Sequence, residues 1–96
     1  MLIQLPTTLN GGDVVAASHM FGRTAVRFVD VIVHAPHLCN ATDDPERVYV
    51  VGLHHRLGST EWGQGLYDFT FEQAKAELQK RNGWVLVTDH PLAPTD

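Results

Sequence analysis

Residues 70–87 read TFEQAKAELQKRNGWVLV and contain a helix start, a helix body, a helix end and a following strand. Thr70 and Gln73 have the spacing of a capping box, in which the threonine hydroxyl accepts the third helical amide and the glutamine reaches back. Gly83 suits the left-handed residue that follows a helix. The stretch therefore predicts a helix over residues 71–82 and a strand over residues 84–88. The apolar residues of the helix recur on one face: Phe71, Ala74 and Leu78.

The amino-terminal part predicts a second, shorter helix. Asp13 can cap a helix over residues 14–21, because its carboxylate can accept a free amide at the helix start. Val14, Ala17 and Phe21 fall on one stripe of that helix, and Gly22 is placed to end it. We expect this helix to pack on the same sheet as the first.

Two long β-rich segments lie between these helices. Residues 24–34 (TAVRFVDVIVH) and 47–56 (RVYVVGLHHR) are rich in β-branched and aromatic residues, and residues 66–69 predict a short third strand. We therefore expect one α+β domain over residues 1–96: a two-layer domain with a mainly antiparallel sheet of about four strands and two helices, in the order α-β-β-β-α-β. Pro91 and Pro94 predict a frayed tail over residues 90–96.

Asp30 and Arg27 lie within a strand whose other residues suggest a core position. A buried carboxylate without a partner is costly. We expect Asp30 to pair with a basic group, to accept hydrogen bonds from amides, or to face a partly wet surface. Both faces of this strand are largely apolar, so one of them could be covered by a partner, and a homodimer is possible.

Composition narrows the classes of function. The chain has 44% apolar and 19% charged residues and a formal net charge of −4, so it resembles an ordinary soluble domain and nucleic acid is an unexpected partner. Cys39 is the single cysteine, which excludes an intrachain disulfide. Residues 1–5 contain no Lys or Arg and precede Pro6, and no apolar run exceeds four residues. We expect a cytoplasmic protein without a membrane segment.

A metal centre is one reading of the histidine content. The chain has six histidines, and His34, His37 and Cys39 lie within six positions. Zinc needs four converging ligands. His54 and His55 are the other candidates, but a simple hairpin places His54 on the order of 23 Å along the strand from His34. A small metal-dependent or His/Cys-dependent enzyme is thus the alternative to a non-catalytic protein, and the sequence shows no cofactor motif.

The clearest candidate binding residue is Trp62, in the glycine-rich stretch GSTEWGQG of residues 58–65. A large aromatic residue on such a loop is typical of interface anchors, with Glu61 and Gln64 beside it. The alternative is that Trp62 folds back over the edge of the core. The loop before the second long strand adds an acidic group that could meet a basic partner: Asp43, Asp44 and Glu46.

The order helix, three antiparallel strands, helix over residues 13–82 resembles the double-stranded-RNA-binding domain. Gly63-Gln64-Gly65 precede the last helix, and Ala74-Lys75 occupy the place of that family's alanine–lysine step. The resemblance implies duplex RNA as a ligand. That family places adjacent lysines at the helix start to hold phosphates, and here Phe71 and Glu72 stand there instead.

The leading hypothesis from the sequence is a small acidic protein-binding module without catalytic activity, which inhibits or regulates a larger protein complex. Phage and mobile-element inhibitors of host-defence complexes, including anti-CRISPR proteins, share this profile. The hypothesis depends on the compact acidic composition, the glycine-flanked Trp62 and the lack of a catalytic motif.

Overall fold

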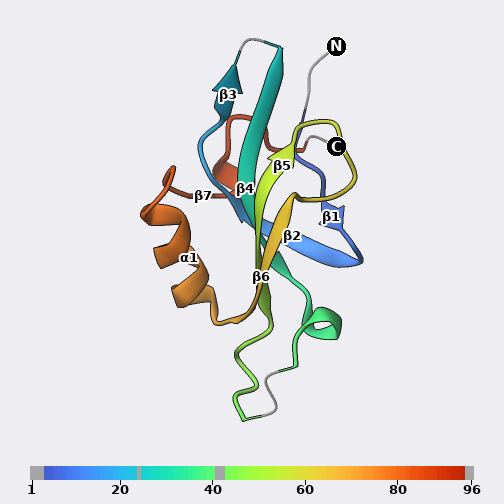
Figure 1. Cartoon of the computed structure of the whole chain (residues 1–96), viewed down its shortest axis with the longest axis vertical. Coiled ribbons are helices and arrows are strands. Elements are labelled where there is room, and N and C mark those ends of the chain that lie inside the picture. Colours follow the sequence, from blue (N-terminus) through green and yellow to red (C-terminus); the bar gives the residue numbers. More distant parts are fainter. Residues whose placement is uncertain (1–3, 24, 41–42, 95–96) are drawn as a thin grey trace.

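The computed structural model describes residues 4–23, 25–40 and 43–94. This part of the chain is mostly β: seven strands form one antiparallel, curled sheet, and one α-helix packs on it (Figure 1). The prediction of an α+β domain with two helices and about four strands is therefore wrong. The strands are β1 (Thr8–Leu9), β2 (Gly12–Ala17), β3 (Phe21–Arg23), β4 (Val26–His34), β5 (Tyr49–Arg56), β6 (Gln64–Phe69) and β7 (Val85–Leu86).

The predicted amino-terminal helix is replaced by two strands. Asn10 and Gly11 both have positive φ, at 50° and 82°, and they form the two-residue turn that pairs β1 with β2. This dipeptide is a strong hairpin signal, because the turn that matches the twist of two strands needs positive φ at both central positions. β2 then pairs with β4, and its β-branched Val14 and Val15 suit the pleated sheet. Asp13, expected to cap a helix, lies within β2 opposite His34.

The central strands are those that the sequence predicts. β4 and β5 pair antiparallel along most of their length, and β6 pairs with the other edge of β5. The sheet order is β1-β2-β4-β5-β6, while β3 adds to β4 and β7 adds to β2. β5 carries a bulge, in which Leu53 and His54 together lie opposite Asp30 and His54 has φ of 57°.

The helix α1 (Phe71–Gln79) covers one face of the sheet and confirms the capping-box prediction. Gln73 N–H donates to the Thr70 hydroxyl at 3.1 Å, and Thr70 N–H donates to the Gln73 amide oxygen at 3.0 Å. Ala74 and Leu78 are buried against the sheet. The sheet residues of this layer are Ala16, Ile32, Val51 and Leu53. None of the described helices is both long and apolar enough to cross a membrane.

A second core lies on the opposite side of the curled sheet, where β4 contributes Val29, Val31 and Val33. The two ends of the described chain close this core, because Leu5 N–H donates to the Leu92 carbonyl at 2.7 Å. His90 is buried, its Nε2–H donates to the Ser18 carbonyl at 2.8 Å, and its Nδ1 accepts from Leu92 N–H. Within residues 90–96, for which the sequence predicts a frayed tail, His90 and Leu92 contact the rest of the chain, and residues 95–96 lie outside the described part.

Candidate functional site

The candidate metal ligands are held apart by the fold. His37 Nε2–H donates to the Asn10 carbonyl at 2.9 Å, the His34 ring packs against Tyr49 at 5.2 Å, and the Cys39 thiol donates to the Tyr49 carbonyl. Across the residues that the structure describes, no three His, Cys, Asp or Glu side chains converge as a metal site would need. Within the same ranges, no histidine is hydrogen-bonded to a cysteine, serine or threonine side chain.

Cys39 lies beside Asp68, on the bulged part of β6. Partial burial raises the pKa of the Cys39 thiol above its ordinary value, and the Asp68 charge acts in the same direction, while a hydrogen bond to the Asp68 backbone opposes them. The thiol is therefore less ionised than a free one, which is the reverse of what a nucleophilic cysteine needs.

Trp62 folds back over the sheet. Its ring packs against the second core, and a Cβ at Gly52 or Gly65 would stand 2.8 Å from a Trp62 ring atom. The loop that carries Trp62 is held to β5 by a hydrogen bond, in which the buried His55 donates from Nδ1–H to the Glu61 carbonyl at 3.0 Å. The ring thus fills the space that the glycines leave. The other residues predicted for binding are separate: Glu61 and Gln64 are exposed beside this loop, while Asp43, Asp44 and Glu46 form the distant acidic loop.

A group of side chains that the sequence did not single out lies where β3, β4 and β5 meet. Phe28 pairs with Phe21 on one side and with Arg56 on the other, and Arg23 pairs with Val26. Residues paired directly across antiparallel strands share a face of the sheet. We call this surface the aromatic–arginine face and define it by Phe21, Arg23, Phe28, His54 and Arg56.

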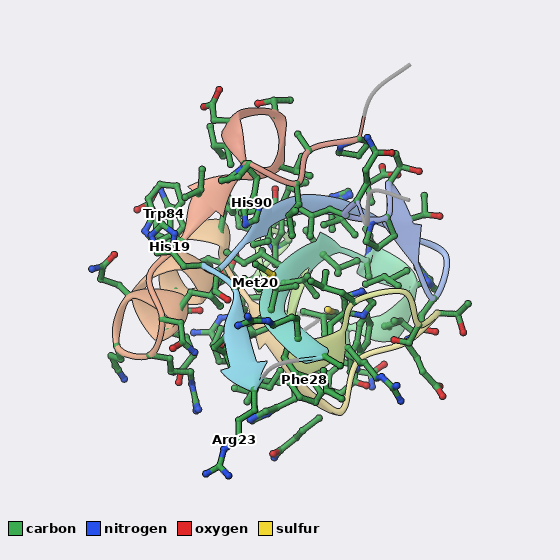
Figure 2. All side chains as sticks on the ribbon, turned by 90° about the horizontal axis from the view of Figure 1, so that it is seen from above. His19, Met20, Arg23, Phe28, Trp84 and His90 are labelled. Atoms are coloured by element: carbon green, nitrogen blue, oxygen red, sulfur yellow. The ribbon has the colours of Figure 1, made fainter. Side chains whose placement is uncertain are left out.

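The rings of this face are in contact and partly open to solvent. Phe21 and Phe28 stack with centroids 5.9 Å apart, and the His54 ring stands edge-on to them at 5.6 and 6.2 Å. His54 is exposed, whereas His55 on the opposite side is fully buried, as their adjacent positions in a strand predict. In Figure 2, which looks onto this end of the molecule, Arg23 extends outward near Phe28, and His19 lies by Trp84.

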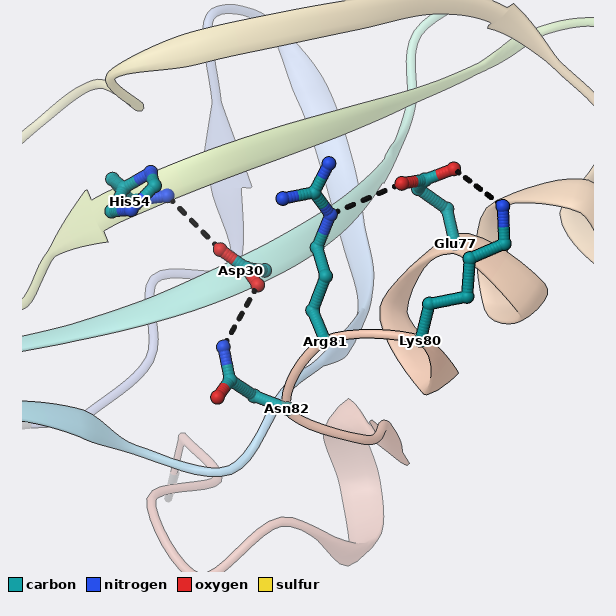
Figure 3. Close-up of polar contacts among 6 residues, drawn as sticks. All are labelled: Asp30, His54, Glu77, Lys80, Arg81 and Asn82. Carbon is teal, nitrogen blue, oxygen red and sulfur yellow. Dashed lines mark hydrogen bonds and ion pairs between the residues drawn. The ribbon is translucent and has the colours of Figure 1, made fainter.

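Asp30 lies on β4 between the aromatic–arginine face and the part of the sheet that α1 covers. It is 1% exposed, and its carboxylate accepts from the His54 backbone N–H at 3.1 Å and from the Asn82 amide at 3.4 Å (Figure 3). Its own N–H donates to the Ser18 hydroxyl at 2.8 Å. Of the three alternatives expected for Asp30, a basic partner, amide hydrogen bonds or a partly wet surface, the structure shows amide hydrogen bonds. The carboxylate holds the bulge that places the His54 ring against Phe21 and Phe28.

The cations of the chain divide into two groups. Outside the aromatic–arginine face, Arg47 pairs with Asp44, Lys75 pairs with Glu72, and both Lys80 and Arg81 pair with Glu77. Lys75 also lies over the rings of Phe71 and Trp84, at 4.8 and 5.1 Å. Among the described residues, three arginines form no ion pair, and all three belong to β3, β4 or the end of β5: Arg23, Arg27 and Arg56.

Two shallow hollows flank α1 on the far side from this face. One, of about 360 Å³, lies at the start of the helix between Tyr49 and Phe71 and has Glu46 and Glu72 at its rim. The other, of about 420 Å³, runs between β6 and the outer side of α1, with Tyr67, Asp68 and Lys80 among its lining.

The arrangement that resembles the double-stranded-RNA-binding domain is not present, because residues 14–21 are not helical. The lysine at the corresponding step, Lys75, is engaged by Glu72 and two aromatic rings within the chain. Comparison of the chain with protein family models, with characterised proteins and with solved structures found no match.

Proposed function

We propose that the protein is a non-catalytic protein-binding module, of the inhibitor or regulator class expected from its sequence, and that the aromatic–arginine face is its contact surface. One observation supports this most: two exposed arginines, Arg23 and Arg56, which form no ion pair with any described residue, lie beside a partly open cluster of aromatic rings. Aromatic residues and arginine are the residue types that protein interfaces enrich, and they dominate measured binding energies.

The surroundings of the face support the same assignment. Met20 and Val26, adjacent to it in the chain, are 47% and 39% exposed, which extends the apolar area. The face is built on strands rather than on a loop, and Asp30 fixes its central bulge through hydrogen bonds. A rigid surface binds with a smaller loss of conformational entropy than a mobile one.

The proposal assigns Trp62 a structural role instead of the anchor role considered from the sequence. Its ring is packed against Gly52 and Gly65, which supports the alternative that Trp62 completes the core. Glu61, Gln64 and the acidic loop then belong to the solvated surface.

The test uses the intact chain as bait in extracts of its native cells and compares variants of the rings. His54→Asn removes one ring and keeps a residue type that tolerates positive φ. Phe21→Ala removes a second ring at the sheet edge. We expect the captured partner to be lost with either variant and retained with Lys80→Glu, an exposed change on α1. Equal capture by all four proteins would refute the assignment, provided that circular dichroism shows each variant folded.

A further inference from the structure

The partner's chemistry can be argued from the charges of the aromatic–arginine face, and this step rests on the proposed function. Arg23 and Arg56 are exposed and project from the same side of the sheet. No carboxylate among the described residues forms an ion pair with either. The carboxylate of Asp30, at the border of the face, is buried and directed at His54 N–H and Asn82.

The acidic loop before β5 lies too far away to neutralise these arginines. Glu61 follows β5 in a loop whose backbone lies near that of Arg56, since the Ser59 hydroxyl donates to both carbonyls, but among the described residues its carboxylate forms no ion pair with Arg56. The segment with Asp43, Asp44 and Glu46 precedes β5, whereas Arg56 ends it, and the two lie towards opposite ends of the long axis (Figure 1). Seven residues of strand separate Tyr49 from Arg56, a distance of about 23 Å at ~3.3 Å per residue. Exposed charges are screened over about 8 Å at physiological salt. The positive charge of the face is thus available to a ligand.

The strand register gives the distance between Arg23 and Arg56. β3 and β5 flank β4, so Arg23 and Arg56 lie two strand spacings apart and are offset by two residues along β4. With strands about 4.8 Å apart, their Cα atoms are about 12 Å from each other. Phe28 lies on the strand between them, and the ring of Phe21, from the strand that carries Arg23, stacks against it.

We propose that the face binds an acidic, extended segment of a partner protein. Two carboxylates of the segment pair with Arg23 and Arg56, and an apolar side chain between them packs on Phe21 and Phe28. An extended chain advances about 3.3 Å per residue and its side chains alternate between two faces, so the two carboxylates lie four positions apart with the apolar side chain midway between them. Arginine forms bidentate pairs with carboxylates, which gives this recognition its geometry. The net charge of −4 and the small number of unpaired cations favour a protein segment over a nucleic acid.

The test measures binding of short fluorescent peptides to the whole protein by polarisation. One peptide carries two glutamates four positions apart with leucine midway between them, a second replaces each glutamate by lysine, and a third replaces each by glutamine. We expect the glutamate peptide to bind, and added salt to weaken it. The lysine peptide should not bind. Equal affinity for the glutamate and glutamine peptides, or tighter binding of single-stranded oligothymidylate than of the glutamate peptide, would overturn the inference.

Charge variants complete the test. Arg23→Gln combined with Arg56→Gln changes the net charge by −2, and Lys80→Glu on α1 does the same away from the face. We expect the double variant to raise the dissociation constant of the glutamate peptide at least about fivefold, and Lys80→Glu to change it less than about twofold. Equal effects would mean that overall charge, not this face, attracts the peptide. If native partner capture needs the rings but ignores both arginines, the inference fails while the proposed function stands.

Discussion

Replacing Asp30 by alanine should lower the free energy of unfolding by about 3 kcal/mol. The change removes the acceptor of His54 N–H and of the Asn82 amide. A hydrogen bond to a charged group contributes about 1.5–3 kcal/mol, and a buried donor left unpaired costs about 1–3 kcal/mol. Part of this loss is offset, because the 1%-exposed carboxylate no longer has to be desolvated. For a domain of this size, the melting temperature should fall by roughly 12–24 °C.

Asp30→Asn is the matched control, because the amide keeps an oxygen for His54 N–H and has nearly the same shape. Asn82 can turn its amide and offer its oxygen to the new NH2 group, so we expect a loss within about 1 kcal/mol. Urea unfolding, followed by the fluorescence of the half-buried Trp62 and Trp84, measures both variants. The reasoning is refuted if Asp30→Ala unfolds within about 0.5 kcal/mol of the natural chain, since the network would then contribute almost nothing.

Three further predictions concern other parts of the fold. Gly52→Ala should destabilise the protein by about 2 kcal/mol and shift tryptophan emission to the red, since its Cβ would stand 2.8 Å from the Trp62 ring; an unshifted spectrum would show that the ring does not pack there. Gly11→Ala, at φ of 82°, should cost about 1–2 kcal/mol in the same unfolding assay, whereas a neutral result would argue against the β1–β2 turn. Because the pKa of the Cys39 thiol is raised, its alkylation near pH 8 should be slower than that of a free thiol, and the rate should rise as the pH approaches the raised pKa. An alkylation rate near pH 8 equal to that of glutathione would contradict this prediction.

Local signals explain the part of the fold that the sequence predicts. The capping box at Thr70 and Gln73 marks the start of α1, and the runs of β-branched residues mark β4 and β5. These features act within a few residues, so they need no knowledge of distant contacts.

The amino-terminal third was mispredicted because tertiary pairing outweighs a weak helical pattern. Asp13 and the stripe of Val14, Ala17 and Phe21 fit a helix when they are considered alone. The Asn10-Gly11 turn fixes a hairpin instead, and β2 gains partners in β1, β4 and β7. More weight on that dipeptide would have indicated the strand.

The helix wrongly predicted over residues 14–21 is also the reason why the sequence did not predict the aromatic–arginine face. With Phe21 assigned to a helix, nothing in the sequence brings it to Phe28, and the link from Phe28 to Arg56 depends on the strand register. The bulge at His54 shifts that register by one residue, and no local sequence pattern predicts this bulge. That Arg23 and Arg56 form no ion pair within the described residues depends on the tertiary structure, which the sequence does not give.

The pairing of β2 with β7 affects how the chain matures during translation. Ala16 and Ala17 pair with Leu86 and Val85, so this part of the β2 edge stays unpaired until residues 85–86 have left the ribosome, whereas Gly12 and Asp13 pair with β1. Closing so long a loop is entropically slow. An open β edge is a template for wrong pairing, and the nascent protein should therefore depend on chaperones more than its small size suggests.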